Sequence, residues 1–216
     1  MTITFALLSV IIAYLLGSVN SAIIISRLVS GKDIRNSGSG NAGATNVLRS
    51  VGKGAAIATM LFDVLKGVFA VLIGGALANA VSVPPQYFAM VSGIAVILGH
   101  NYPVYFGFKG GKGIATSAAV IMTMDWKIGV ALLIIALTIM AISKYVSLGS
   151  IVASALFPIA ALIVHSGDWT FFMFALAVGV LAIYKHKENI KRLINGTESK
   201  LGSKKKTADA EKGIEQ

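Results

Sequence analysis

Residues 128–143 read IGVALLIIALTIMAIS, a run without a single charged side chain, and this run decides the class of fold. A helix that is apolar on every side belongs in a membrane or deep inside a core. A second run of the same kind, residues 148–165, follows after a short polar turn. The whole chain shares this character, since 56% of its 216 residues are hydrophobic and 13% are charged, against about 25% charged in soluble domains. The sequence therefore predicts a polytopic membrane protein.

Further apolar segments surround this pair: residues 3–25, 54–80, 86–99, 114–124 and 169–184. At about 20 residues per spanning helix, the chain has room for about five to seven spans and no sizeable soluble domain. The segment 114–124 is too short to cross a bilayer alone, so we expect a short or re-entrant helix that its neighbours bury. The predicted fold is an all-α, polytopic membrane helix bundle of about seven transmembrane helices, including the short one.

Basic residues fall almost entirely on one side of this layout. Cytoplasmic loops concentrate Lys and Arg, and exported loops lack them. Outside the apolar runs, Lys127 alone falls on the side that is poor in basic residues. We therefore expect the amino terminus outside, and the polar loops and the carboxyl terminus in the cytoplasm. No basic residue precedes the first run, which is the reverse of a signal peptide, so this run is expected to stay as a span.

The chain divides into two parts by composition. Residues 1–194 are expected to form one membrane domain. Residues 195–216 include three consecutive lysines and have too few apolar side chains to pack. We expect them to form a solvated, largely disordered cytoplasmic tail.

Two ionisable residues interrupt the run 54–80. Asp63 and Lys66 lie three positions apart and therefore share one helix face, where they can neutralise each other as an ion pair. Alternatively, one of them points into an internal polar site, because ionisable residues inside a membrane are often functional.

The first polar stretch, residues 36–49, reads NSGSGNAGATNVLR. Its glycines let successive backbone N–H groups turn toward one anion, and its side chains add donors and a fixed positive charge. Part of it matches the dinucleotide pattern GxGxxG, but it follows a spanning helix and not a strand, which excludes that type of site. The alternative is a flexible connector. As an anion site, it would use Ser39, Gly40, Asn41, Thr45, Asn46 and Arg49.

The second polar stretch, residues 99–117, reads GHNYPVYFGFKGGKGIATS. It is not a nucleotide P-loop, because Gly113 follows Lys112 where that motif needs Ser or Thr. It leads into the short helix from residue 114, whose free N–H groups and positive dipole end would face an anion beside Lys112. His100 is expected to be structural and Lys109 interfacial. The candidate anion-binding residues are Gly110, Gly111, Lys112, Gly113, Thr116 and Ser117.

The third polar stretch, residues 184–198, reads YKHKENIKRLINGTE. On a helix, His186 and Asn189 share a face and Arg192 lies three residues further, so they can point together at a ligand. The alternative is a basic interfacial helix, which explains the lysines but not the His/Asn pair. A short turn, residues 144–150, adds Ser147 and Ser150, and the sequence leaves open which of them faces the site.

The three polar stretches and the turn KYVSLGS resemble the motifs of the bacterial acyl-phosphate-dependent glycerol-3-phosphate acyltransferases, the PlsY family, over nearly the whole chain. The resemblance implies a seven-span enzyme of the bacterial cell membrane. Such an enzyme transfers a fatty acyl group from acyl phosphate to the 1-hydroxyl of sn-glycerol 3-phosphate, the first acylation of phospholipid synthesis. It would release lysophosphatidic acid and phosphate.

The resemblance also implies roles for single residues. Ser39, Arg49, Lys112, His186 and Asn189 match the polar residues associated with catalysis and the substrate phosphates. Gly110, Gly111 and Gly113 match the glycine-rich motif associated with the acyl phosphate, Ser147 matches the conserved-type turn, and Glu198 matches an acidic position with a structural role.

The proton transfer and the cofactor requirement are less evident from the sequence. No His is followed five residues later by Asp, so the signature of acyl-CoA-dependent acyltransferases is missing. We hypothesise that His186 positions a phosphate and stays neutral beside the cations, while a substrate phosphate oxygen takes the hydroxyl proton. A covalent route through Ser39 lacks a partnered base.

The cytoplasmic acids near the motifs suggest no metal cage by their spacing, so we expect activity in chelator, no metal and no cofactor. We expect no nucleic-acid partner, and a monomer is favoured. The alternative function is a membrane carrier of a phosphorylated solute, which would need polar groups along a path through the membrane. Here the polar motifs gather on one side.

Overall fold

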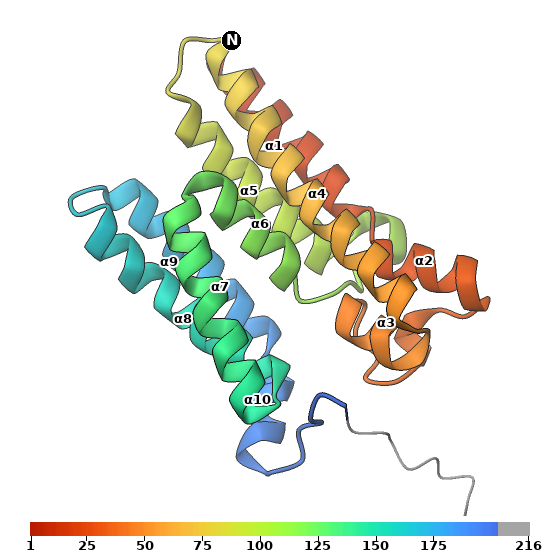
Figure 1. The fold of residues 1–216 in the computed structure, drawn as a ribbon. Helices are drawn as coiled ribbons and strands as arrows, with labels where there is room; N and C mark the ends of the chain where they lie inside the picture. The colour runs from red at the N-terminus through yellow and green to blue at the C-terminus, as the bar shows by residue number, and fades with distance from the viewer. Residues whose placement is uncertain (203–216) are drawn as a thin grey trace, which may run out of the picture.

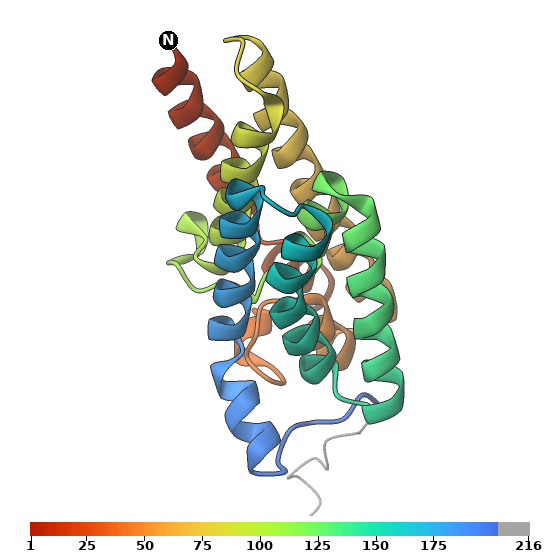
Figure 2. The ribbon, with the colours of Figure 1, turned by 90° about the vertical axis from the view of Figure 1, so that its left-hand side faces the viewer.

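The structure is a computed structural model that describes residues 1–202 of the chain. Every regular element within that range is helical, which confirms the predicted all-α class. Figures 1 and 2 show the long helices side by side, with the N-terminus at one end of the bundle and α2, α3 and α10 toward the other. The α-helices are α1 (Thr2–Ser18), α2 (Ser21–Ser30), α3 (Ala44–Ser50), α4 (Lys53–Asn79), α5 (Pro85–Asn101), α6 (Ile114–Met124), α7 (Trp126–Ser143), α8 (Val146–Val164), α9 (Trp169–Lys185) and α10 (Lys187–Ile194), with 3-10 turns η1 (Ile34–Asn36) and η2 (Val104–Phe106).

Several helices meet the requirements of a membrane span. Among the described residues, four segments are long and apolar enough: α1 with α2, α4, α7 and α8. A fifth is reached if α9 and α10, bent by 58° at their junction, count as one. Helices α5 and α9 have 17 residues and α6 has 11, so none of them reaches the length of a span by itself. The chain is a polytopic helix bundle, and the total of about seven spans stays a prediction.

The first predicted span, residues 3–25, is interrupted in the structure. Helix α1 ends at Ser18, and α2 begins after Asn20, whose side chain accepts a hydrogen bond from the N–H of Ile23 at 3.1 Å. The helix breaks there because an Asn side chain that caps the next helix competes with helix continuation, yet α1 with α2 is still long and apolar enough to be the expected span.

Helices α1 and α5 pack with their backbones in direct contact. A Cβ on Gly17 would lie 2.2 Å from the carbonyl oxygen of Val96, and a Cβ on Gly99 would lie 2.2 Å from that of Tyr14. Small residues at such crossings let membrane helices approach closely. The Tyr14 hydroxyl also donates to the carbonyl of Tyr102 at 2.8 Å, so the contact extends past the end of α5.

The short helix α6 lies inside the bundle, as predicted. It packs against α4, α5 and α7, and its Ala119 and Val120 are buried. Gly67 of α4 makes room for it, since a Cβ there would lie 2.8 Å from the Thr116 carbonyl oxygen. The fold thus places the start of α6, directly after the glycine-rich loop, against three longer helices.

The residues after α10 turn back onto the bundle. The N–H of Leu201 donates to the Lys144 carbonyl at 2.7 Å, and Glu198 contacts Ser147 of α8 at 2.7 Å. Glu198 is half-buried and the other residues of 195–202 are exposed, so this part of the expected tail is largely solvated, although hydrogen bonds hold it to the bundle. The rest of the predicted tail, residues 203–216, lies outside the described residues.

Candidate active site

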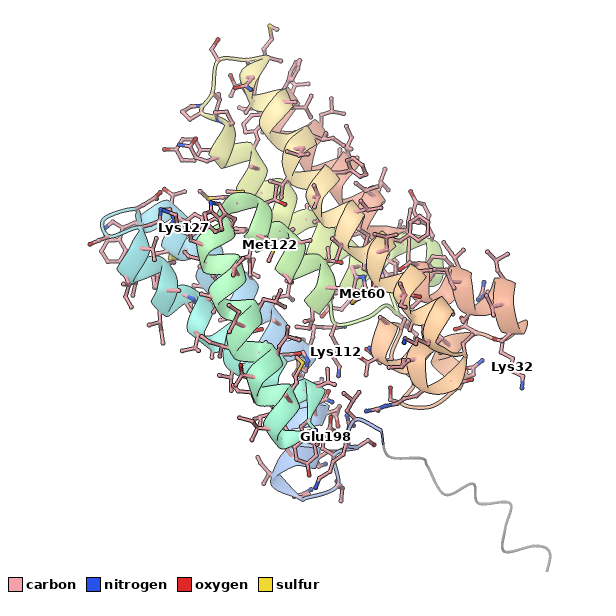
Figure 3. The ribbon with its side chains drawn as sticks, in the orientation of Figure 1. Lys32, Met60, Lys112, Met122, Lys127 and Glu198 are labelled. Atoms are coloured by element: carbon pink, nitrogen blue, oxygen red, sulfur yellow. The ribbon has the colours of Figure 1, made fainter. Side chains whose placement is uncertain are left out.

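Side chains from all three polar stretches meet at one end of the bundle. Figure 3 shows Lys112 and Glu198 near each other at that end, while Lys127 lies toward the opposite end. Lys112 comes from the loop before α6, and Glu198 comes from the segment after α10. The fold therefore joins parts of the sequence that are far apart.

Glu198 accepts hydrogen bonds from several of these side chains. Its Oε1 accepts hydrogen bonds from Ser147 Oγ at 2.7 Å and Asn189 Nδ2 at 2.6 Å, and its Oε2 accepts one from Arg192 Nε at 2.7 Å. Burial alone would raise the pKa of Glu198, but these hydrogen bonds outweigh it and lower the pKa, so the carboxylate is charged. We call Ser147, Asn189, Arg192 and Glu198 the Glu198 cluster.

Lys112 is attached to this cluster through Asn189. Its Nζ donates to Asn189 Oδ1, while the amide nitrogen of Asn189 donates to Glu198, so one carboxamide connects the cation to the anion. Burial lowers the pKa of Lys112 to about 8, against the opposing effect of Glu198 and together with the nearby charges of Arg192 and Arg49. Lys112 is therefore mainly protonated at pH 7 and lies in a field of several positive charges.

Arg49 reaches the same end of the bundle from α3. It is exposed, and its Nη2 donates to the Ser199 carbonyl at 3.3 Å, beside Glu198. Of the five predicted catalytic residues, the structure thus brings Arg49, Lys112 and Asn189 together. Ser39 is exposed on its loop, and no hydrogen bond of its hydroxyl occurs within residues 1–202.

His186, directly after the last residue of α9, is buried and neutral. Its Nδ1 lies 2.7 Å from the Ala182 carbonyl oxygen, and since a carbonyl only accepts, Nδ1 carries the hydrogen. Burial and the charge of Lys112 lower the pKa of His186 to about 4. Its other ring nitrogen, Nε2, is therefore a hydrogen-bond acceptor, suited to a hydroxyl and unsuited to a phosphate dianion.

The glycine-rich loop presents its backbone differently from our expectation. The N–H of Gly110 donates to the Asn101 carbonyl at 3.3 Å and that of Gly111 to the His100 carbonyl at 3.2 Å, so neither is free for a substrate. Gly113, at a φ of +76°, is instead the N-cap of α6 without any side-chain cap. The first N–H groups of α6 have no acceptor within the helix, so they are a candidate anion site.

Helix α6 also borders an apolar groove between itself, α7, α8 and α9. The groove begins at Ile114, the first residue of α6, and continues past Ser117 and Ile121 on the same helix face. Ser117 Oγ is buried there and has no hydrogen-bond partner among the described residues. Ser150 also lines this groove, whereas Ser147 belongs to the Glu198 cluster, which answers the question that the sequence left open.

Two predicted substrate contacts belong to the fold instead. Thr116 is fully buried and donates to the Asp63 carbonyl at 3.1 Å. Asn46 accepts from the N–H of Ser39 at 2.9 Å, and its amide nitrogen donates to three carbonyl oxygens within the first loop. Because the hydrogen-bonding groups of both side chains are used internally, we assign them to positioning and not to the substrate.

The other predicted residues of the first loop remain accessible. Gly40 has a φ of +73°, which favours glycine, and Asn41 and Thr45 are half-buried without a side-chain hydrogen bond among residues 1–202. The loop touches the glycine-rich loop, since a Cβ on Gly111 would lie 2.4 Å from the Ala42 carbonyl oxygen. The first two polar stretches are therefore neighbours.

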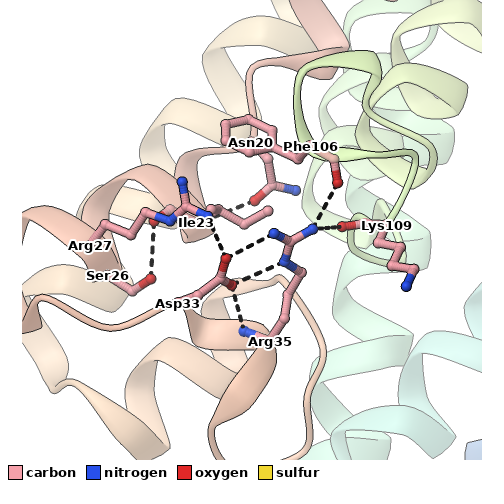
Figure 4. Close-up of polar contacts among 8 residues, drawn as sticks. All are labelled: Asn20, Ile23, Ser26, Arg27, Asp33, Arg35, Phe106 and Lys109. Atoms are coloured by element: carbon pink, nitrogen blue, oxygen red, sulfur yellow. Dashed lines mark hydrogen bonds and ion pairs between the residues drawn. The ribbon is translucent and has the colours of Figure 1, made fainter.

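An Asp/Arg pair that sequence reasoning missed holds these two loops together (Figure 4). Asp33 pairs with Arg27 at 2.7 Å and with Arg35 at 2.8 Å, and the Arg35 hydrogen bond is the main reason that the pKa of Asp33 lies well below its usual range. Arg35 Nη1 also donates to the carbonyls of Phe106 at 2.8 Å and Lys109 at 3.2 Å. An acid two residues before an Arg, just ahead of the first motif, was the available signal.

The combined arrangement suits an amphiphilic anion. Positive side chains and open N–H groups lie at the mouth of an apolar groove, so a charged head and an acyl chain can be held together. Within residues 1–202, no group of three or more His, Cys, Asp or Glu side chains has the geometry of a metal site.

Comparisons with known proteins agree on one family. The family model described as glycerol-3-phosphate acyltransferase matches residues 7–196. A glycerol-3-phosphate acyltransferase of Thermoanaerobacter sp. (strain X514) is 50% identical over 203 residues, covering 93% of this chain and 98% of the relative. One from Clostridioides difficile (strain 630) is 44% identical, covering 90% and 95%.

Solved structures are similar as well. The crystal structure of PlsY (YgiH), an integral membrane glycerol 3-phosphate acyltransferase, in its glycerol 3-phosphate form has a TM-score of 0.83 and 40% identity, covering 91% of this chain and 96% of that one. Its lysophosphatidic acid form has a TM-score of 0.79 and 38% identity, covering 91% and 95%.

Proposed function

This chain belongs to the glycerol-3-phosphate acyltransferase family, the PlsY family of integral membrane enzymes, and on that premise we propose that its acyl donor is an acyl phosphate. The acceptor atom is the 1-hydroxyl of sn-glycerol 3-phosphate, and the products are lysophosphatidic acid and phosphate. The observation that carries the choice of donor is the open N-terminus of α6, an anion site located where the apolar groove begins.

The donor would lie with its phosphate at the start of α6 and its chain in the groove. Helix N-termini bind phosphates through free N–H groups and the positive dipole end. The apolar wall of Ile114 and Ile121 begins at the same helix turn, so the acyl carbon is placed at the border between the polar and apolar regions. Ser117 Oγ, unpartnered and buried in that wall, is close enough to the border to contact the donor's head.

Glycerol 3-phosphate would lie on the other side of Lys112. Two phosphates repel each other unless cations separate them, and Lys112 and Arg49 converge there. At about 4 Å and an effective dielectric of about 20, one cation contributes roughly 4 kcal/mol against a unit charge before desolvation is subtracted. Asn189, held by Glu198, sets the position of Lys112, while Ser39 and Arg192 lie on the flanking segments.

The reaction needs no covalent enzyme intermediate. The substrate hydroxyl oxygen forms a bond to the acyl carbon, the bond from that carbon to the phosphate oxygen breaks, and the hydroxyl proton ends on the departing phosphate. Lys112 and the α6 N–H groups stabilise the leaving phosphate. His186 would accept a hydrogen bond from the attacking hydroxyl at Nε2, a role that replaces phosphate positioning because the neutral ring has no hydrogen there to donate.

The donor is tested with purified protein in lipid, supplied with glycerol 3-phosphate and either acyl phosphate or acyl-CoA. We expect release of phosphate and lysophosphatidic acid with acyl phosphate, unaffected by chelator, and no product with acyl-CoA. Turnover with acyl-CoA alone would overturn the proposed donor. The alternative function, a carrier for a phosphorylated solute, has no support in the family match. Uptake of glycerol 3-phosphate into protein-containing vesicles without acylation would indicate such a carrier.

We also propose that the motif end of the bundle faces the cytoplasm and the amino terminus lies outside. The chain has no cysteine, so single cysteines report orientation without background. In intact cells, a cysteine at Gly167, between α8 and α9, should react with a membrane-impermeant maleimide, and one at Ser199 should not. The reverse labelling pattern would contradict this orientation.

A further inference from the structure

A buried ionic cluster lies beneath the glycine-rich loop and outside the site described above. It consists of Asp63 and Lys66 in α4 and His100 near the end of α5, with side chains only 3–5% exposed. Lys66 Nζ lies 2.8 Å from Asp63 Oδ1 and 2.9 Å from His100 Nδ1. Lys66 also donates to the carbonyls of Gly17 and Val19, at 3.2 and 3.1 Å, where α1 ends.

Burying such a cluster is energetically unfavourable compared with apolar packing. Charged side chains inside a membrane protein are expensive, and a buried ion pair is often no more stable than apolar residues of the same size. Stability therefore does not explain the presence of Asp63 and Lys66. Their contacts with the neighbouring loop supply an explanation.

The His100 ring connects the cluster to Gly111. Because an ammonium group only donates, His100 Nδ1 accepts from Lys66, and the ring is held at that nitrogen. The opposite nitrogen, Nε2, faces the loop: a Cβ on Gly111 would lie 2.2 Å from it. The bare backbone of Gly111 therefore rests directly on the imidazole edge.

Backbone carbonyls of α5 and α4 also hold the loop, one on each side of Lys112. The N–H of Gly111 donates to the His100 carbonyl at 3.2 Å, which fixes the loop before Lys112. After Lys112, the Thr116 hydroxyl donates to the Asp63 carbonyl at 3.1 Å, which fixes the first turn of α6. Lys112 and the first N–H groups of α6 thus lie between two attachments to the backbone carbonyls of His100 and Asp63, while the His100 ring is the one side chain of the cluster that reaches the loop.

We propose that Asp63, Lys66 and His100 are positioning residues that hold the glycine-rich loop in the geometry that receives the donor phosphate. They touch no substrate and act through Gly111 and Thr116. The inference rests on the proposed use of acyl phosphate, since that is the ligand of the loop. It assigns a function to intramembrane charges that the reaction itself does not use.

The main test removes both charges together. Asp63→Leu with Lys66→Met leaves no unpaired buried charge, so the double variant is expected to fold with a melting temperature close to that of the parent. Its kcat/KM for acyl phosphate should fall on the order of 100-fold, because a misplacement of about 1 Å has effects of that size. The KM for glycerol 3-phosphate should change by less than about twofold, because Lys112 is its one proposed contact in this loop and is also held in place by Asn189.

Ser21→Ala is the matched control. Ser21 Oγ donates to Asp63 Oδ1 at 2.8 Å and has no hydrogen bond to Gly111 or Thr116, so its loss weakens the same cluster and leaves the loop contacts in place. We expect a melting temperature lowered by a few degrees and unchanged kinetic constants. Equal kinetic losses in the control and in the double variant would show a merely structural role and overturn the proposal.

His100→Asn decides the matter if the double variant is not recovered as folded protein. Asn keeps an acceptor for Lys66 and removes the ring edge beneath Gly111, so a raised KM for acyl phosphate alone is expected, with rates referred to folded protein. Parent-like constants for acyl phosphate would overturn the positioning role. If the parent itself does not turn over acyl phosphate, the proposed donor fails, and the two failures are distinguishable.

Discussion

Two lysines of this molecule, Lys66 and Lys112, lie in clusters of similar chemistry but differ in how many protein acceptors surround them. Lys66, 5% exposed, is surrounded by four acceptors: Asp63, His100 and two backbone carbonyls. An ammonium group has three hydrogens, so nothing is left for a ligand. Lys112, at the end of the bundle, contacts one acceptor among the described residues, Asn189. The number of protein acceptors, more than the presence of an acid nearby, separates the structural cation from the one that can bind substrate.

The largest expected effect comes from removing the lysine with open donors. Lys112→Met should lower kcat by on the order of 1,000-fold, because stabilisation of the leaving phosphate by a preorganised cation is lost. Phosphate release measures it, and Lys109→Met, an exposed lysine of the same loop, is the control with parent-like rates. If Lys112→Met kept more than about a tenth of the parent rate, Lys112 would not be the cation that stabilises the leaving phosphate.

A smaller effect is expected when the acid that organises the open cluster loses its charge. Glu198→Gln removes the partner of Arg192 and the carboxylate that raises the pKa of Lys112. We expect kcat to fall about 10- to 100-fold and the alkaline limb of the pH–rate profile to move to lower pH. Glu188→Gln, exposed on α10, should leave both unchanged. An alkaline limb that stays in place would mean that Glu198 does not act on Lys112.

The pH dependence gives a third, more moderate effect. With a pKa of about 8, Lys112 is charged below that pH and neutral above it, so activity should fall about tenfold per unit above pH 8. Between the folded pKa of about 8 and the ordinary lysine value of 10.5, the unfolded chain binds more protons, so this group makes stability rise with pH. Rates and melting temperatures should therefore change in opposite directions between pH 8 and 10, and the contribution of Lys112 to both should be constant from pH 6 to 7.

His186 should not contribute to the pH dependence of the rate. Because its pKa is about 4, the ring is neutral throughout the range from pH 5 to 7 and adds no acidic limb there. An acidic limb near pH 6.5 that disappears in His186→Gln would show that the histidine titrates during turnover, as a general base would, and would contradict the role of a neutral acceptor.

The smallest expected effect distinguishes two serines of α8, Ser147 and Ser150. Ser147 donates to Glu198, whereas Ser150 donates to the Val146 carbonyl and lines the apolar groove. Ser147→Ala should lower kcat/KM for glycerol 3-phosphate about fivefold, the usual net size of one hydrogen bond, and Ser150→Ala should change it by less than about twofold. Equal effects would mean that the Glu198 cluster tolerates the loss of a donor.

Much of the fold could be predicted from the sequence because apolar runs and their lengths are local properties. The all-α class, the buried short helix after the glycine-rich loop and the Asp63–Lys66 pair all follow from such patterns. The break at Asn20 could not be predicted in this way, because an Asn inside an apolar run either points to a partner or caps a new helix. Only its neighbours in the fold decide between the two.

The candidate site was predictable in its residue types and less so in their use. Arg49, Lys112 and Asn189 meet as their shared polarity suggested. The direction of each hydrogen bond depends on tertiary neighbours, so the inward N–H groups of Gly110 and Gly111 and the internal use of Asn46 had no signal in the sequence. Glu198 carries no pattern of its own, yet three side chains donate to it.

The contact between α1 and α5 has a consequence for biogenesis. Tyr14 bonds to Tyr102, 88 residues later, and Gly17 meets the backbone of Val96, so α1 leaves the ribosome long before its partner exists. During that interval its small residues face lipid, and the bundle is completed by lateral docking after insertion. A nascent chain arrested before α5 should therefore present Gly17 and Ser18 as a vacant groove, a surface that membrane quality-control proteases and chaperones can recognise.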